Sequence, residues 1–245
     1  MTPPSPDAGV RVLLYHAVDG PDPADRLGLR VSREAFRAQM TALRVEGYRV
    51  VPLARVLDTS CPNEPGLVAI TFDDGYRSEV STAGVLKELG FTATFFLVPR
   101  FLDGVKQPAH YWERWPHMTW DDAGALADAG FDVGAHSMTH PDLTACDPSR
   151  LLEETAGVKA LLEKRLGRDV LGFSFPYGRH NNHVRQATER AGYRLACTSR
   201  CGLNTTSGRC FDLARTEVTG YDRAVDFRRK LQGRYDWVAG WRNPR

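Results

Sequence analysis

The chain repeats one local signal at the end of several predicted helices: a glycine followed directly by an aromatic residue that enters a strand. Glycine readily adopts the left-handed conformation that ends a helix, and the apolar, β-branched residues that follow favour a strand. The signal occurs four times, at Gly47-Tyr48, Gly90-Phe91, Gly130-Phe131 and Gly192-Tyr193. This is the rhythm of β-α units, so the sequence predicts an α/β fold with mainly parallel strands.

Length and composition indicate a single globular domain. The 245 residues can bury a core large enough for one α/β barrel or one doubly wound sheet. We expect a disordered lead at residues 1–9 and one domain over residues 10–245. Net charge is +2, and the basic run Arg228-Arg229-Lys230 is expected to form a solvated helix face. Nucleic acid is therefore a disfavoured partner.

The sequence carries no sign of a membrane segment. No apolar run approaches the ~20 residues of a membrane-spanning helix. No charged segment followed by an apolar one marks a signal peptide, so the chain as given is expected to be cytoplasmic. The sequence does not define an oligomeric state.

Two adjacent carboxylates, Asp73 and Asp74, follow the apolar run 67–72, which has the pattern of a buried strand. Like charges this close need a cation or a proton beside them to remain ionised at low cost. Gly75 then allows the chain to turn sharply. The structural alternative is a simple Asp-Asp-Gly turn that caps the helix beginning near Arg77.

Two histidines four residues apart, His136 and His140, follow another strand-like run. Together with Asp74 they form a sufficient ligand set for a divalent metal with an open position for water. Such a metal lowers the pKa of that water toward neutrality. Asp73 is not needed as a ligand and is therefore the candidate general base.

Four polar segments lie just after the ends of predicted strands: His16, Asp73-Asp74, His136 and Pro176-Tyr177. In a parallel barrel these ends open on one face, where such folds hold their active sites. A backbone N–H near Tyr177 would donate to a developing oxyanion. Histidine is suited to protonate a leaving amine, which makes His16 the candidate acid; a structural core histidine is the alternative. These parts describe hydrolysis of an amide or ester.

Several other side chains are left with two interpretations. Trp112 and Trp115 lie in a long connection, residues 99–118, where they would stack on a sugar ring or pack the connection down. His180 and His183 are expected at a solvated helix start, with substrate contact or acid catalysis as the alternative.

The five cysteines are Cys61, Cys146, Cys197, Cys201 and Cys210. Three of them fall within one segment, which allows a small zinc knot or a disulfide. The odd number and the absence of a Cys-x-x-Cys pair favour reduced thiols.

The chain resembles the polysaccharide deacetylases of carbohydrate esterase family 4. The resemblance rests on Thr-Phe-Asp-Asp-Gly-Tyr at 71–76, His-Ser-Met-Thr-His at 136–140 and Phe-Ser-Phe-Pro-Tyr-Gly at 173–178, in the family order. It covers roughly residues 10–237 and implies a distorted (β/α)7 barrel. It also implies a divalent metal, usually zinc, on Asp74, His136 and His140, although cobalt and nickel suit the same ligands. Asp73 would be the base and the backbone N–H of Tyr177 the oxyanion donor.

The sequence departs from the family pattern in two places. Many members carry an arginine in the third motif that orients the catalytic aspartate, and Ser174 holds that place here. Arg215, at the end of a late strand, is the candidate substitute. The usual closing motif near the C-terminus is missing, and Leu13-Leu14-Tyr15-His16 looks like that motif moved to the front. This order resembles deacetylases of poly-N-acetylglucosamine and related exopolysaccharides, and it assigns His16 as the general acid.

These observations predict a metal-dependent hydrolase that removes N-acetyl groups from an N-acetylated amino sugar in a glycan, oligosaccharide or precursor. The candidate substrate contacts are Pro176, Arg215, Trp112 and Trp115. One alternative is a hydrolase of cyclic amides or imides, and the complete Asp-His-His set speaks against a metal-free version of it. The other alternative is a non-catalytic glycan-binding module, which the retention of both Asp73 and Asp74 disfavours.

Overall fold

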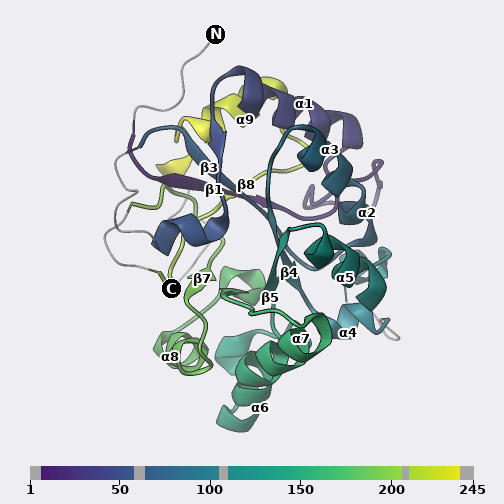
Figure 1. Cartoon of the computed structure of the whole chain (residues 1–245), viewed down its shortest axis with the longest axis vertical. Coiled ribbons are helices and arrows are strands. Elements are labelled where there is room, and N and C mark those ends of the chain that lie inside the picture. Colours follow the sequence, from purple (N-terminus) through teal and green to yellow (C-terminus); the bar gives the residue numbers. More distant parts are fainter. Residues whose placement is uncertain (1–6, 58–63, 105–109, 206–209, 238–245) are drawn as a thin grey trace.

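The structure is a computed structural model that describes residues 7–57, 64–104, 110–205 and 210–237. A single parallel sheet runs through it (Figure 1), with the strand order β7-β6-β5-β4-β3-β1-β8 and with β2 paired to β3 off this path. The strands are β1 Val10–Tyr15, β2 Arg49–Val50, β3 Leu67–Phe72, β4 Thr94–Leu97, β5 Asp132–Ala135, β6 Gly172–Ser174, β7 Leu195–Cys197 and β8 Thr216–Glu217.

All pairings between these strands are parallel. The longest, between β1 and β3, runs from Val10↔Leu67 to Tyr15↔Phe72 and places the ends of both strands level with each other. Past β7, an isolated parallel bridge joins Cys197 to Leu213, shortly before β8, so the two outer strands curve toward each other. The sheet thus has the curled form of a distorted α/β barrel, and the predicted fold class is confirmed.

Helices cover the outside of the curled sheet. They are α1 Arg33–Val45, α2 Arg77–Val80, α3 Thr82–Glu88, α4 Pro99–Leu102, α5 Trp120–Asp128, α6 Pro148–Leu152, α7 Val158–Leu166, α8 Asn182–Arg190 and α9 Ala224–Leu231. Shorter helical segments are η1 Leu53–Leu57, η2 Tyr111–Arg114, η3 Leu143–Ala145, η4 Glu153–Gly157 and η5 Pro176–Gly178. Helix α1 packs beside both α3 and α9, and α5 packs beside α7 (Figure 1). Within the described residues, no helix is both long and apolar enough to cross a membrane.

The predicted helix ends are confirmed at the glycines. Gly47, Gly90, Gly130 and Gly192 all have positive φ. After the first three of these glycines, the aromatic N–H donates back to the carbonyl five residues earlier, for example Phe91 to Leu86 at 2.8 Å. This bond closes the helix in a Schellman motif. Because the aromatic residue is engaged there, the strands begin later than the sequence predicted, and β4 starts only at Thr94.

The connection 99–118, predicted as a loop, contains two helical segments, α4 and η2. Pro99 occupies the first turn of α4, where its missing N–H costs nothing. The long helical segment from Pro148 to Leu166 is interrupted between α6 and α7 by the π-helical segment η4. The lead predicted at residues 1–9 lies outside the described residues up to position 6, and Ala8 forms an isolated bridge with Pro65.

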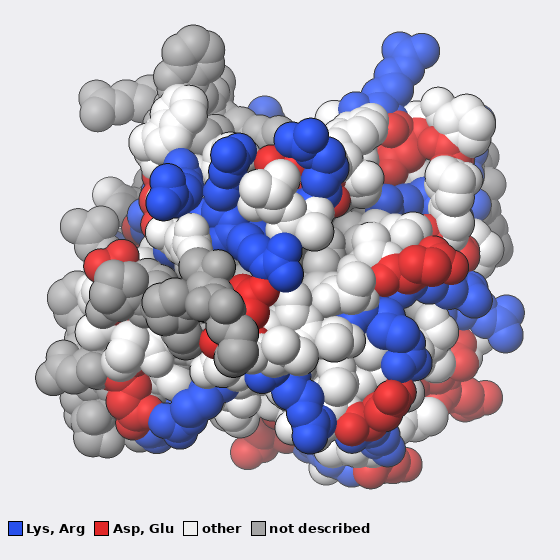
Figure 2. Space-filling model, turned by 90° about the horizontal axis from the view of Figure 1, so that it is seen from above, with Lys and Arg blue, Asp and Glu red and all other residues white. Residues whose placement is uncertain are grey.

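The basic run of α9 is only partly a solvated face. Figure 2 shows basic and acidic side chains interspersed on the face seen from above. Arg228 contacts Glu46 at 2.5 Å. Lys230 turns inward, where its Nζ donates to the Glu217 carbonyl at 2.8 Å and to Asp222 at 2.5 Å. The prediction of a solvated face is therefore wrong for Lys230, because its ammonium group is bound by the Glu217 carbonyl and the Asp222 carboxylate.

An aromatic stack holds the centre of the core between the sheet and the helices. Phe95 is fully buried, and its ring stacks on Phe72 at a centroid distance of 4.8 Å and an interplanar angle of 7°. Phe131 contacts the same ring edge-on at 5.7 Å.

Truncation of this ring should cost much of the stability of the fold. We expect Phe95→Ala to lower the free energy of unfolding by about 3–5 kcal/mol, because it removes apolar burial and leaves a cavity. Urea denaturation followed by circular dichroism measures the change. Leu152→Ala is the control, since Leu152 is 64% exposed and surface changes usually stay within about 0.5 kcal/mol. A loss for Phe95→Ala as small as that of the control would contradict this account of the core.

Candidate active site and metal centre

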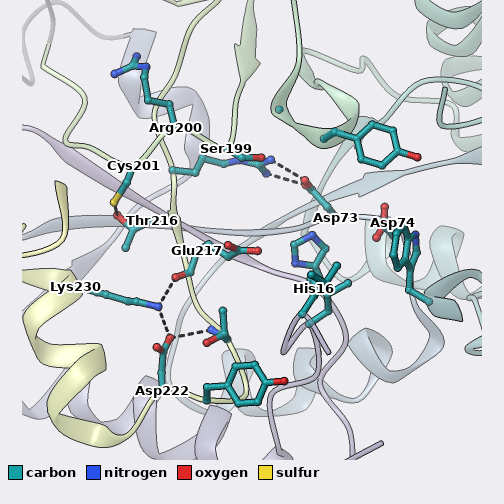
Figure 3. Close-up of a pocket in the computed structure, with 18 of the residues that line it drawn as sticks. His16, Asp73, Asp74, Ser199, Arg200, Cys201, Thr216, Glu217, Asp222 and Lys230 are labelled. Carbon is teal, nitrogen blue, oxygen red and sulfur yellow. Dashed lines mark hydrogen bonds and ion pairs between the residues drawn. The ribbon is translucent and has the colours of Figure 1, made fainter. Parts of the chain in front are cut away.

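The polar segments predicted at strand ends meet around one cavity of about 750 Å³. Because the strands are parallel, their carboxyl ends lie at the same edge of the sheet. Figure 3 shows His16, which follows β1, on the same cavity as Asp73 and Asp74, which follow β3. His136, His140 and Tyr177 border the same cavity.

Backbone strain is concentrated in the three motifs. Within the described residues, four non-glycine residues have positive φ: Asp74 (76°), Ser137 (62°), His140 (60°) and Tyr177 (59°). Each such residue costs on the order of 1–3 kcal/mol and persists only where its surroundings fix it. Three of the four border the cavity. The fold therefore stores strain where it positions these side chains.

The two histidines converge on one oxygen of Asp74. The Oδ1 atom lies 3.5 Å from Nε2 of His136 and 3.5 Å from Nε2 of His140. All three side chains are buried, and their ligand atoms lie within 4.8 Å of one another. Asp74 Oδ1 has no hydrogen-bond partner in the part of the chain that the structure describes. A buried, unpaired carboxylate oxygen is costly, so this arrangement fits a divalent cation between the three groups.

Neighbouring groups prepare the two imidazoles as ligands. His136 Nδ1 lies 2.8 Å from the carbonyl oxygen of Ser174. A carbonyl can only accept, so Nδ1 donates to it, and Nε2 is the ring nitrogen that faces Asp74 and could bind a cation. Burial lowers the pKa of His140 to about 4 against the attraction of Asp74. His140 is therefore neutral at physiological pH, as a metal ligand must be.

Glu154, a residue that the sequence analysis did not single out, holds the backbone of the loop that carries His136 and His140. Its buried carboxylate accepts the amide protons of Met138 and Thr139, both at 2.9 Å. Glu154 belongs to the π-helical segment η4, a type of irregularity frequent at functional sites. The interruption of the long helix thus turns a carboxylate toward the ligand loop.

Arg215 holds Asp73 with both of its terminal nitrogens. Its Nη1 donates to Oδ1 at 2.8 Å and its Nη2 to Oδ2 at 2.6 Å. Ser174 Oγ donates to the same Oδ2 at 3.0 Å. Burial raises the pKa of Asp73, but Arg215 and His136 outweigh burial and hold that pKa well below its usual range. Asp73 is therefore ionised and fixed in orientation.

Arg215 thus occupies the orienting place that Ser174 leaves vacant in the third motif. The two residues are joined by a bond of 2.9 Å from Nη2 to the serine oxygen. Arg215 is 1% exposed, and its Nε donates to the carbonyl of Thr198 at 2.9 Å. Its guanidinium is committed to Asp73 and the backbone, which leaves little of it for the substrate contact also predicted for this residue.

His16 is half-buried and directly follows β1. It borders the same cavity as Asp73 and Asp74 (Figure 3). Its Nδ1 is buried and has no hydrogen-bond partner within the described chain.

Aromatic rings border the cavity at Tyr177, the predicted oxyanion donor, and at Trp112, a predicted substrate contact. The exposed ring of Tyr177 packs edge-on against the His140 ring at 4.7 Å. Trp112 borders the cavity and stacks on the His110 ring at 4.2 Å. Pro176 is buried and does not border the cavity.

Trp115 packs the connection down rather than facing the cavity. It is 7% exposed, and its indole nitrogen donates to Asp22 at 2.7 Å. The guanidinium of Arg30 lies over its ring at 4.9 Å. Of the two interpretations left open for this tryptophan, the packing one describes its surroundings.

The cavity continues past His16 toward α9, over residues for which the sequence offered almost no signal. This part is bordered by Leu27, Arg200, Cys201, Glu217, Tyr221 and Lys230 (Figure 3). Glu217 is the last residue of β8, whereas the rule that found His16 selects residues that follow a strand, so it does not select Glu217. The others come from loops and a helix face, where residue type alone predicts no shared location.

Of the remaining sequence candidates that the structure describes, Cys201 borders the cavity, whereas His180, His183 and the other cysteines do not. His180 stacks on Phe175 at 4.7 Å, and His183 is exposed at the start of α8. Cys146, Cys197, Cys201 and Cys210 are free thiols, and Cys61 lies outside the described residues.

Comparison with known proteins identifies the family. The polysaccharide deacetylase family model matches residues 61–196, more than half of the chain, which therefore belongs to this family, carbohydrate esterase family 4. The chain is 28% identical over 216 residues, 86% of its own length and 72% of the other, to the "Putative polysaccharide deacetylase YxkH" of Bacillus subtilis (strain 168).

Two further similarities extend this comparison. The peptidoglycan-N-acetylmuramic acid deacetylase PdaA of the same organism is 30% identical over 130 residues, 52% of this chain and 44% of PdaA. The structure of IcaB from Ammonifex degensii matches with a TM-score of 0.73 at 25% identity, covering 97% of this chain and 98% of that one. The family supports deacetylation of glycans as the class of reaction, and Asp74, His136 and His140 form its possible metal site.

Breaking the Arg215–Asp73 pair should strongly destabilise the fold. We expect Arg215→Met to lower the free energy of unfolding by about 3–5 kcal/mol, because a buried carboxylate loses its partner. Urea denaturation measures this loss. Arg168→Met is the control: Arg168 pairs with Asp128 on the surface, where an ion pair is worth at most about 1 kcal/mol. Equal losses for the two variants would refute the special role given to the buried pair.

Proposed function

We propose that this protein is a metal-dependent hydrolase that removes N-acetyl groups from an N-acetylated amino sugar in a glycan, an oligosaccharide or a glycan precursor. The observation that carries the proposal is Asp74 Oδ1, buried and unpaired, 3.5 Å from Nε2 of both His136 and His140. Beside it stands Asp73, a carboxylate that this ligand set does not require.

Asp74, His136 and His140 would hold the cation. Zinc, cobalt and nickel all accept two imidazoles and one carboxylate. The chemistry supplied by such a cation is electrophilic: it polarises an amide carbonyl and makes water a stronger acid. Three protein ligands would leave room for water or a substrate oxygen, as catalytic sites of this kind require.

Asp73 is suited to take the proton from the attacking water. The bidentate contact with Arg215 and the bond from Ser174 fix both of its oxygens. Orientation of this kind reduces the entropy that must be lost on reaching the transition state. The same contacts keep the carboxylate ionised, which is the form that a general base requires.

Tyr177 and His16 supply the remaining parts of an amide hydrolysis. The left-handed conformation of Tyr177 sets the direction of its peptide N–H, which would donate to the oxygen that gains negative charge. His16 would deliver a proton to the sugar nitrogen as the carbon–nitrogen bond breaks, so that a neutral amine leaves. The products are acetate and the free amino sugar.

Two observations support an amino sugar as the substrate. PdaA, which shares 30% identity with this chain over 130 residues, is named for its action on N-acetylmuramic acid. The cavity is also bordered by Trp112 and by the exposed Tyr177, and aromatic rings of this kind offer flat apolar faces to a sugar.

The direct test is acetate release from chitooligosaccharides by protein loaded in turn with zinc, cobalt and nickel, compared with chelator-treated protein. We expect release only with a bound cation. Ring opening of a cyclic ureide, assayed in parallel, tests the cyclic-amide alternative. Metal-loaded protein that binds the oligosaccharide without releasing acetate would instead indicate a glycan-binding module.

Removal of the proposed base gives a second test. Asp73→Asn should lower kcat by about 10²–10⁴-fold, because an amide cannot accept the proton from water. Metal binding, measured by isothermal titration calorimetry, should remain largely intact because Asp73 is not a ligand. A near wild-type rate would exclude Asp73 from the mechanism.

Removal of the proposed acid gives a third. His16→Ala should lower kcat by about 10²–10⁴-fold through loss of the proton donor. The loss should shrink for a substrate whose leaving group needs no proton, such as an activated acetate ester, and the ratio of the two rates measures the effect. Full activity of the variant on the amide would show that His16 is not the acid.

A further inference from the structure

Asp74 has two carboxylate oxygens, and they have different surroundings. Oδ1 faces the two histidines and has no hydrogen-bond partner in the described residues. Oδ2 accepts a hydrogen bond of 3.1 Å from the hydroxyl of Tyr76. One oxygen is therefore occupied by a neutral donor, while the other remains available to a cation.

The turn after β3 brings the tyrosine to this position. Asp74 and Gly75 both have left-handed backbone, with φ of 76° and 72°. These two successive left-handed residues reverse the direction of the chain. The phenol of Tyr76, two residues after Asp74, therefore reaches the Asp74 carboxylate. A side chain at position 75 would meet Leu97 at 3.1 Å in a conformation that already favours glycine.

The Tyr76 ring has little freedom to move. It is 1% exposed and lies between the rings of His117, at a centroid distance of 4.8 Å, and Trp115, at 5.5 Å. Its backbone N–H donates to the buried carboxylate of Glu79 at 2.8 Å. The hydroxyl is therefore presented to Asp74 by a packed ring rather than by a mobile side chain.

The connection after α4 supplies that packing. Met118 N–H donates to the Gly75 carbonyl, and Arg77 N–H donates to the Pro116 carbonyl, both at 2.9 Å. Trp115, which does not face the cavity, is itself tied to Asp22 by its indole nitrogen. A segment that carries no metal ligand thus braces the turn that carries Asp74.

We propose that Tyr76 is a positioning residue for the metal centre, which holds Asp74 so that it offers a single oxygen, Oδ1, to the cation. The inference rests on the proposed metal site. Without the hydroxyl, Oδ2 would be buried with no donor, which is costly for a carboxylate. Asp74 would then turn both oxygens toward the cation, whereas the two histidines converge on Oδ1 alone. Partners that orient metal ligands typically contribute about 10–100-fold to metal affinity.

The test is the variant Tyr76→Phe, which deletes one oxygen and keeps the ring. We expect zinc affinity, measured by competition with a chromophoric chelator, to fall by about 10–100-fold. The visible absorption spectrum of the cobalt-loaded variant should also change, because it reports the number and geometry of the ligands. Unfolding of the metal-free proteins by urea shows whether the fold is intact.

Tyr193→Phe is the matched control. Tyr193 is 4% exposed and donates to the carbonyl of Thr155 at 3.1 Å, the same length as the bond from Tyr76. Its ring packs against Phe173, among residues that do not border the cavity. The control should therefore lose a comparable buried hydrogen bond and retain wild-type zinc affinity and the wild-type cobalt spectrum.

The outcomes separate this inference from the proposed function. Wild-type zinc affinity together with an unchanged cobalt spectrum in Tyr76→Phe would overturn the inference alone. Wild-type protein that binds zinc but releases no acetate would overturn the proposed reaction, while the positioning role is still decided by affinity. Wild-type protein that binds no divalent cation would overturn both.

Discussion

Two carboxylates buried side by side at the end of β3 are the constraint around which this site is built. Asp73 and Asp74 are 3% and 4% exposed, and two adjacent negative charges in such a place need compensation. The fold compensates them separately. Arg215 neutralises Asp73 by a bidentate contact, whereas Asp74 faces two imidazoles that leave room for a cation. This division gives two chemically similar residues different tasks.

The surrounding structure serves to keep those tasks distinct. Ser174 contributes twice, since its hydroxyl bonds to Asp73 and its carbonyl fixes the tautomer of His136. Glu154 holds the histidine loop through backbone amides, and Tyr76 holds the second oxygen of Asp74. The strained, left-handed residues at the cavity persist because these contacts over-determine their positions.

Much of the fold was predictable because its signals are local. The run predicted as a strand at 67–72 forms β3 with those bounds, and the four glycines predicted to end helices all have positive φ. The errors fall where local signals conflict with tertiary demands. Strands after the helix-ending glycines start late because the first aromatic residue closes the helix. The π-helical interruption at 153–157 has no distinctive composition. Its effect, which is to turn Glu154 toward the loop that carries His136 and His140, depends on a contact between distant segments.

The candidate site divides in the same way. Motif residues at strand ends could be grouped from sequence, because parallel strands direct their carboxyl ends to one edge. The roles of Arg215 and Tyr76 could not be established from the sequence, although Arg215 was a candidate for orienting Asp73. Arg215 lies 142 positions from Asp73, and no spacing rule connects such residues. Tyr76 belongs to the first motif, but only the left-handed turn shows that its hydroxyl returns to Asp74.

The sequence by itself determined the order of helices and strands, the parallel sheet and the residue types gathered at its edge, because these follow from periodicity and from glycine conformation over short distances. Only the tertiary structure decided which charge neutralises which, which oxygen of Asp74 remains unpaired and which tryptophan faces the cavity. Those outcomes depend on distances between segments far apart in the chain, and the folding of the sheet sets these distances.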